Sequence, residues 1–109
     1  MGLAASQARL LMLTARKSDL EFQLQIINQA RMQLSNMVSS LFSASANLTP
    51  GNPFEQRLNA QFAVLQSRDK MLELQANQVN TQHEAVQTEV EAVRKVISQN
   101  IQGSFKLMS

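Results

Sequence analysis

The stretch Asn47–Gln56, NLTPGNPFEQ, interrupts the chain near its middle and decides how the rest can fold. Pro50 and Pro53 lack an amide donor and disfavour a helical residue before them, so a helix cannot run through this segment. Between the two prolines, Gly51 and Asn52 supply positions that tolerate a left-handed backbone. We therefore expect the chain to reverse direction here.

The same stretch carries the signals of a helix start. Asn52 suits an N-cap, Pro53 suits the first helical position, and Glu55 places a negative charge in the first turn. A turn over residues 47–53 is therefore predicted, with a helix beginning directly after it.

Apolar residues on both sides of this turn follow a heptad spacing. Eight of the ten positions reached by alternating steps of three and four before the turn are apolar: Leu10, Leu13, Lys17, Leu20, Leu24, Ile27, Arg31, Leu34, Val38 and Leu41. After the turn, ten of thirteen are apolar: Leu58, Phe62, Leu65, Asp69, Leu72, Ala76, Val79, His83, Val86, Val90, Val93, Ile97 and Asn100. This spacing is typical of amphipathic helices that pack as a coiled coil.

The predicted fold is all-α, with two long antiparallel helices. Helices are expected over residues 3–46 and 54–104, and residues 1–109 form a single hairpin domain. Because only 3 Gly and 2 Pro occur in 109 residues, long uninterrupted elements are favoured.

The polar exceptions to the heptad predict how the two helices are aligned. If the chain folds back about Pro50, Arg31 faces Asp69, and Lys17 faces His83. We predict an ion pair between Arg31 and Asp69 that fixes the register, at some cost in stability. The alternative is that the long Lys and Arg side chains reach from the seam to water.

A second apolar stripe lies outside this seam on each helix. It comprises Ala5, Ala8, Met12, Ala15, Phe22, Ile26, Ala30 and Met37, and then Val64, Met71, Leu74, Val96, Ile101 and Phe105. Because two helices packed along one seam cannot cover both stripes, we expect the hairpin to associate with other copies. A single wider seam is the alternative.

Composition argues against several classes of function. The net charge is only +2, and the basic residues form no cluster with interleaved aromatic residues, so nucleic-acid binding is not expected. No apolar run approaches the ~18 residues of a membrane span, so stable membrane insertion is not expected either. The 14 Gln, 8 Asn and 11 Ser give a largely uncharged polar surface, which suits packing of many copies.

Catalytic chemistry has no support in the residue types present. With one histidine, His83, and no cysteine, a three-ligand metal set cannot be assembled. The sequence contains no glycine-rich phosphate loop and no nucleophile elbow. We therefore predict neither an enzyme nor a cofactor, and we interpret His83 as a seam or interface residue.

The first six residues, MGLAAS, fit an N-myristoylation pattern, but they also continue a helix. Leu3 and Ser6 extend the heptad, and no polybasic patch accompanies Gly2 to support a single acyl chain. We interpret this segment as a helix start. Arg9 interrupts the apolar stretch, and no A-x-A site follows it, so export would use an uncleaved signal.

The turn Pro50-Gly51-Asn52-Pro53 and the ending VISQNIQGSFK, residues 96–106, resemble needle subunits of bacterial type III secretion systems. In that family the C-terminal helix lines the lumen of a helical tube. The resemblance implies assembly contacts at Val93, Ile97, Ile101 and Phe105, with Lys106 near the lumen. The N-terminal segment GLAASQARLLMLTARKSDLEFQLQ is also similar to small bacterial proteins without an assigned activity, and flagellar-type axial proteins are a related possibility.

The function expected from these observations is a structural subunit that self-assembles into a filament or tube. The expected assembly residues are Met12, Phe22, Ile26, Met37, Val93, Val96, Ile97, Ile101 and Phe105. The partner is the chain itself, with an export apparatus or chaperone as a further partner, and the location is the cell surface or exterior. A cytoplasmic coiled-coil adaptor or export chaperone that binds a partner helix is one alternative, and a small secreted hairpin acting as a dimer is another.

Overall fold

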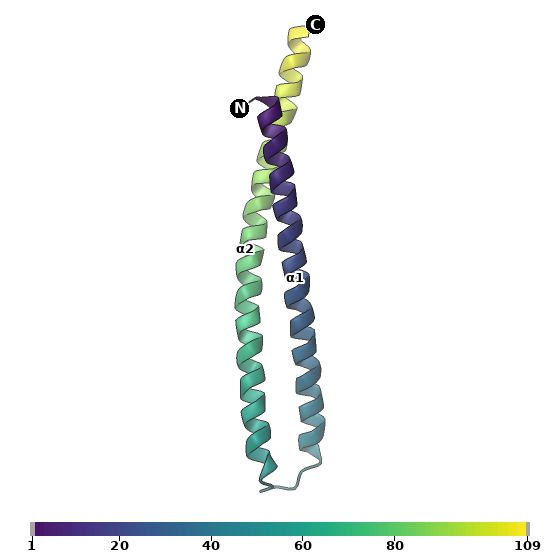
Figure 1. Cartoon of the computed structure of the whole chain (residues 1–109), viewed down its shortest axis with the longest axis vertical. Coiled ribbons are helices and arrows are strands. Elements are labelled where there is room, and N and C mark those ends of the chain that lie inside the picture. The colour runs from purple at the N-terminus through teal and green to yellow at the C-terminus, as the bar shows by residue number, and fades with distance from the viewer. Residues whose placement is uncertain (1, 109) are drawn as a thin grey trace. The chain divides into compact units, whose positions relative to one another are not determined.

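The computed structural model describes residues 2–108, and within them the chain forms two helices and no strand (Figure 1). Helix α1 spans Leu3–Ala46 and helix α2 spans Phe54–Met108, and the two pack antiparallel to each other. The predicted all-α hairpin is therefore confirmed, and α1 has the predicted bounds. Met1 and Ser109, the ends of the predicted domain, lie outside the described residues.

The predicted end of the second helix at residue 104 is wrong. Gly103 and Ser104 are weak helix formers, but α2 continues through them to Met108. The residues that follow, Phe105 to Leu107, accept a helical backbone, and Lys106 lies in the last turn, where a positive charge complements the helix dipole.

The hairpin divides into two compact units, and each unit contains one segment of α1 and one segment of α2. Unit 1 comprises Met1–Gln23 with Val79–Ser109, and unit 2 comprises Leu24–Gln78. The two units are described separately below.

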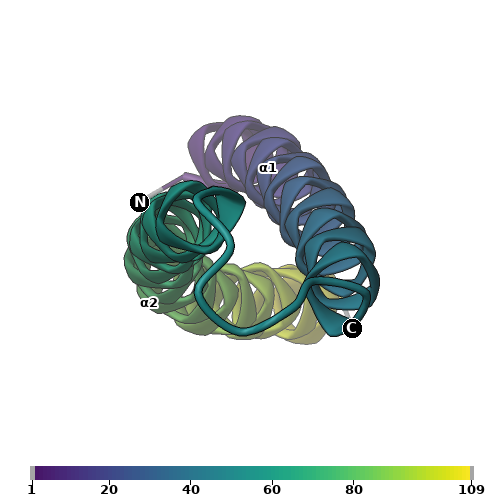
Figure 2. The ribbon, with the colours of Figure 1, turned by 90° about the horizontal axis from the view of Figure 1, so that it is seen from below.

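The turn belongs to unit 2, and its geometry explains the sequence between the helices (Figure 2). The Asn52 amide donates to the Thr49 carbonyl at 3.2 Å, and Gly51 has a φ of 83°. Pro50 before such a glycine is typical of a type II turn. Within residues 2–108 no other residue has a positive φ, so the left-handed conformation allowed for Asn52 is not used.

Asn52 instead caps α2, as its position before Pro53 predicts. Its Oδ1 accepts a hydrogen bond from the Phe54 amide at 3.0 Å. Glu55 reaches back, and its Oε2 accepts a hydrogen bond from the Gly51 amide at 3.4 Å. The first amide of α2 and one amide of the preceding turn therefore have side-chain acceptors, and the bond to Phe54 is the one that caps the helix.

The heptad positions make the core of each unit. In unit 1 the buried side chains are Ser6, Leu20, Val79, Val86, Val90 and Val93. In unit 2 they are Ile27, Leu34, Leu65 and Ala76. All remaining positions of the two heptad series are half-buried, including the polar residues Lys17, Arg31, Asp69 and His83.

Candidate interaction surface

Unit 2 carries an apolar groove between its two helical segments. The groove has a volume of about 670 Å³, and its walls are formed by Asn36, Met37, Ser40, Leu41, Ala60, Gln61, Val64, Leu65 and Arg68. Met37 and Val64 remain 51% exposed, although each lies next to a heptad position. We call this concavity the apolar groove.

A smaller concavity of about 350 Å³ continues along the same flank. It shares Met37 and Arg68 with the apolar groove and adds Ala30, Gln33, Met71 and Gln75 at its rim, with Leu34 and Leu72 at its base. Within these two concavities Arg68 is the one charged residue. This flank of unit 2 is therefore an apolar strip with a single positive charge.

The opposite flank of unit 2 is polar. Its concavity, of about 390 Å³, is lined by Ser35, Gln66, Lys70 and Glu73 around Arg31 and Asp69, with Leu34, Val38 and Leu65 at the base. Ser35 and Met37 lie two residues apart on α1, which turns their side chains by about 200° around the helix axis. The two flanks therefore face different ways, and only one of them suits an apolar partner.

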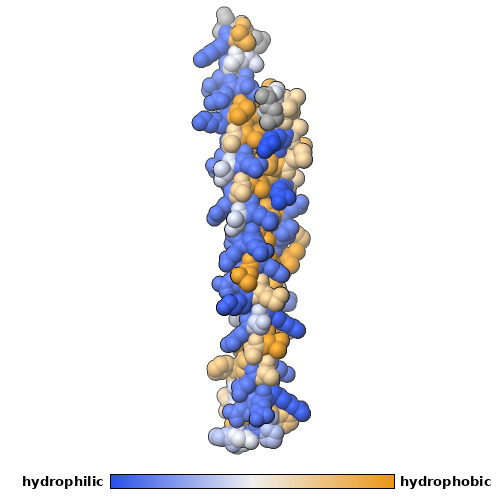
Figure 3. All heavy atoms as spheres, turned by 90° about the vertical axis from the view of Figure 1, so that its left-hand side faces the viewer, coloured by the Kyte–Doolittle hydropathy of each residue, from blue (hydrophilic) through white to orange (hydrophobic). Residues whose placement is uncertain are grey.

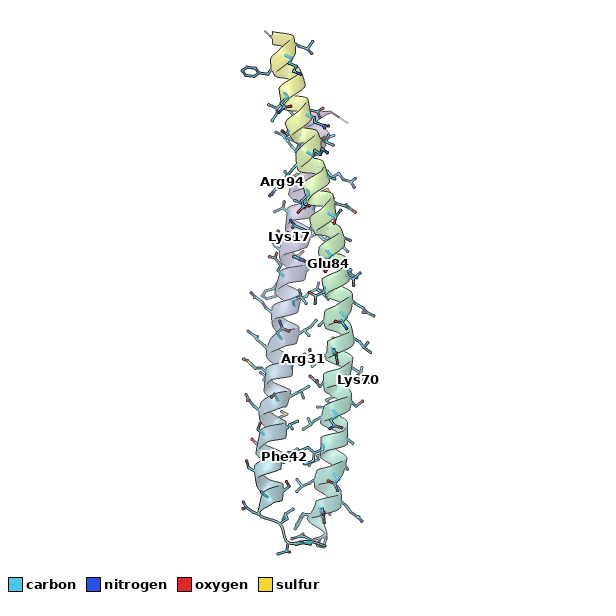
Figure 4. The ribbon with its side chains drawn as sticks, turned by 180° about the vertical axis from the view of Figure 1, so that it is seen from behind. Lys17, Arg31, Phe42, Lys70, Glu84 and Arg94 are labelled. Atoms are coloured by element: carbon cyan, nitrogen blue, oxygen red, sulfur yellow. The ribbon has the colours of Figure 1, made fainter. Side chains whose placement is uncertain are left out.

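Arg31 and Asp69 form the ion pair that the heptad exceptions predict (Arg31 is labelled in Figure 4). Arg31 Nε donates to Asp69 Oδ1 at 2.9 Å, and its second donor, Nη2, reaches Oδ2 at 3.3 Å. The two parallel bonds are the arrangement in which a guanidinium binds a carboxylate most specifically. The hydrogen bond from Arg31 lowers the pKa of Asp69, and the same bond raises the pKa of Arg31.

His83 has a different partner from the one that its register predicts. Its Nε2 lies 3.0 Å from Glu21 Oε1, one helical turn beyond Lys17. Because a carboxylate only accepts hydrogen bonds, Nε2 donates this one. The expected pairing of His83 with Lys17 is therefore corrected to Glu21, whose acceptor oxygen suits an imidazole better than an ammonium group does.

Two further contacts between the helices were not predicted. In unit 1, Arg9 and Glu89 lie 3.3 Å apart, both half exposed. In unit 2, the rings of Phe42 and Phe62 meet edge to face, with centroids 5.8 Å apart (Phe42 is labelled in Figure 4). Both pairs involve a residue on a flank of the seam, which a count of heptad positions does not consider.

The assembly residues expected from the resemblance divide into two groups. Val93 is buried in the core of unit 1, and Ile97 is half-buried there, so packing within the hairpin already uses much of both side chains. Ile101 and Phe105 are exposed, as is Val96. Packing within the hairpin involves Val93 and Ile97 because these two residues occupy heptad positions.

The remaining expected assembly residues, Met12, Phe22, Ile26 and Met37, are all exposed by half or more. Figure 3 shows apolar side chains emerging between hydrophilic ones on one face of the molecule. Within the described part of the chain, no group of histidine and acidic residues could hold a metal ion. Neither described helix offers a stretch long and apolar enough to cross a membrane.

Comparison of the chain with protein-family models, with curated proteins and with solved structures gives no match. The candidate site therefore rests on the geometry of the hairpin itself.

Proposed function

We propose that this chain is a structural subunit that self-assembles into a filament or tube. The observation that carries the proposal is the distribution of apolar side chains. Among the described residues, sixteen large hydrophobic side chains are exposed, whereas nine hydrophobic residues are buried. A hairpin that leaves more large apolar side chains in water than it buries gains stability when other hairpins cover them.

The small core supports the same proposal. Two helices bury one stripe each, and chains with so few buried residues have little free energy of folding to spare. Association buries additional apolar area without requiring a longer chain. In a homopolymer, that area comes from surfaces that every copy already carries.

The end of α2 in unit 1 gives a third reason. Its C-terminal segment runs past the beginning of α1 (Figure 1), and residues 101–107 are all exposed. Ile101, Phe105 and Leu107 lie on this unsupported segment. Because the ends of a chain are poorly held unless they are packed, contact with another copy would stabilise this segment.

In the same proposal the assembly is exported and extracellular, as secretion needles are. The turn Pro50–Pro53 and the exposed residues Ile101 and Phe105 are the features of the resemblance that remain available for this role.

Electron microscopy and sedimentation velocity over a concentration series test the proposal. We expect large uniform particles from the intact chain, growing with concentration. The double variant Ile101→Ser, Phe105→Ser should reduce the assembled fraction at least tenfold, because both side chains are exposed and contribute little to the hairpin itself. Gln102→Ser, also on the exposed segment, is the matched control and should assemble normally.

A second candidate function is supported by the shape of the apolar groove. A concavity lined by the two helices suits one partner helix, as in a coiled-coil adaptor or export chaperone. Small particles of one size at every concentration would contradict the filament and favour this adaptor.

A further inference from the structure

Helix α1 carries an exposed apolar stripe in unit 1 that packing within the hairpin leaves free. Met12, Ala15, Asp19 and Phe22 are spaced by three, four and three residues, so they lie on one face of the helix. All four are exposed, with Met12 at 74% and Phe22 at 62%. We call this set the α1 stripe.

Asp19 is the one charge in the α1 stripe. Within residues 2–108 its carboxylate has neither a hydrogen bond nor an ion pair. Ala15 and Phe22 lie on either side of Asp19 along the stripe. A helix that packs against both of them therefore also places one of its own side chains close to the Asp19 carboxylate. The stripe therefore favours a surface that is apolar with one positive charge.

The apolar groove of unit 2, together with the smaller concavity that continues from it, is such a surface. Val64 and Arg68 line the α2 side of the apolar groove, and Met71 lines the smaller concavity, which also contains Arg68. Arg68 has no hydrogen-bond acceptor or ion-pair partner in the described part of the chain. The spacing from Val64 to Arg68 to Met71 is four and then three residues. Ala15, Asp19 and Phe22 have the same spacing in the α1 stripe.

We propose that the α1 stripe of one copy occupies the apolar groove of a second copy, with the Asp19 carboxylate against the Arg68 guanidinium. The equal spacing lets a parallel alignment with α2 bring Ala15 to Val64 and Phe22 to Met71 at the same time. A methionine sulfur beside an aromatic ring is a favourable contact. The inference rests on the proposed self-assembly and identifies the surfaces that perform it.

The occupant comes from another molecule. The stripe and the α1 wall of the groove, residues 36–41, are segments of one uninterrupted helix, so the stripe cannot fold back onto that wall. A second copy of this chain supplies both the apolar spacing and the opposite charge.

The contact joins two different surfaces, and every copy carries both. Such a heterologous contact leaves one stripe and one groove unused at the ends of each complex. It therefore adds copies until a ring closes or a filament grows, which is the behaviour that the proposed function requires.

Charge reversal tests the contact. Asp19→Arg places two positive groups together, and Arg68→Asp places two negative groups together, so each variant alone should lose at least tenfold in assembled fraction by sedimentation velocity. An equimolar mixture of the two variants should assemble again. In the mixture the reversed stripe of one variant meets the reversed groove of the other, and the remaining stripe and groove, both unchanged, also carry opposite charges.

Two control variants reverse charges elsewhere on exposed positions. Glu84→Arg and Arg94→Asp (Figure 4) lie outside both the stripe and the groove and should assemble as the unchanged chain does. Circular dichroism and thermal unfolding of every variant, at a concentration where the chain is monomeric, separate loss of the contact from loss of the fold.

Each outcome decides between the two proposals. Assembly of the intact chain with loss in both single variants and recovery in the mixture supports the contact. Assembly of the intact chain that neither reversal affects, or a mixture that does not recover, overturns this contact and leaves the proposed function in place. Absence of assembly by the intact chain at every concentration overturns both.

Discussion

Units 1 and 2 are built from the same two helices, yet the side chains between the helices are buried to different degrees. The most buried side chains of unit 1 are almost fully enclosed, with Ser6 at 1%, Val90 at 2% and Leu20 at 3% exposure. In unit 2 the most buried side chains, such as Leu34 and Leu65, stay at 8–9%, and grooves open on both flanks.

Side-chain shape explains the difference. Four of the seven α2 seam positions of unit 1 are valines, and their compact branched side chains fill the space close to the helix axis. Unit 2 instead combines longer leucines with the ring of Phe62 and the Arg31–Asp69 pair. Long and polar side chains hold the helices in register but leave concavities beside them, and those concavities form the candidate interaction surface.

The largest expected effect comes from comparing a leucine in each core. Leu20→Ala should reduce the free energy of unfolding by about 2–5 kcal/mol, towards the upper end, because its site is closed. The loss for Leu65→Ala should lie towards the lower end of the same range, because Leu65 already borders a groove on each flank and its removal creates less new cavity. Urea unfolding at one protein concentration measures both, and a larger loss for Leu65→Ala would contradict the comparison.

The two glycines Gly51 and Gly103 should respond oppositely to alanine. Gly51 in unit 2 has a positive φ, so Gly51→Ala should destabilise the chain by about 1–2 kcal/mol. Gly103 in unit 1 is helical, and a Cβ there meets open space, so Gly103→Ala should stabilise it by about 0.5–1 kcal/mol. Thermal unfolding of the two variants checks the signs, and equal signs would contradict this reading of the turn.

A smaller effect is expected at Ser6, whose hydroxyl is buried without a hydrogen-bond partner in the described part of unit 1. Because an unpaired buried hydroxyl is unfavourable, Ser6→Ala should raise the free energy of unfolding by about 0.5–1 kcal/mol. Ser18→Ala, on the exposed surface, reports the gain from helix propensity alone. A Ser6→Ala variant less stable than Ser18→Ala would show that the hydroxyl is satisfied.

The smallest effect concerns the half-buried pair of unit 2. Because the pKa of Asp69 is lowered in the folded chain, its contribution to stability is present above the unfolded pKa of about 3.9. That contribution disappears as the pH falls through the folded pKa. Asp69→Asn should therefore unfold at a lower temperature than the unchanged chain at pH 7, and the difference should vanish at low pH.

Glu84→Gln is the control for this pH dependence, since Glu84 is exposed and makes no ion pair within residues 2–108. A constant gap between Asp69→Asn and the unchanged chain from pH 7 to low pH would mean that the carboxylate charge is not what the pair contributes.

Much of the fold could be predicted from the sequence, because helix positions follow from local rules. The prolines at 50 and 53 limit both helices, and the heptad series identifies which side chains turn inward. The end of α2 could not be predicted, since residues 105–108 continue the helix past Gly103 without any signal in the glycine itself.

The candidate site could be predicted only in part. The stripes were visible as spacings, and Arg31 and Asp69 could be matched because both occupy heptad positions. The partner of His83 could not be predicted, because Glu21 lies on a flank, and which flank residue a side chain reaches depends on its rotamer. The grooves depend on how neighbouring side chains fill the space beside the seam, which residue spacing does not specify.

The ion pairs also differ in how far apart they lie along the chain. Arg31 and Asp69 are separated by 38 residues, whereas Arg9 and Glu89 are separated by 80. Short loops close at lower entropic cost, so the hairpin closes first near its turn, and pulsed hydrogen exchange should protect unit 2 amides before those of unit 1. During synthesis, residues up to Gln78 are complete before any of the α2 segment of unit 1 exists. The growing chain therefore forms its apolar groove before it can form its tightest core.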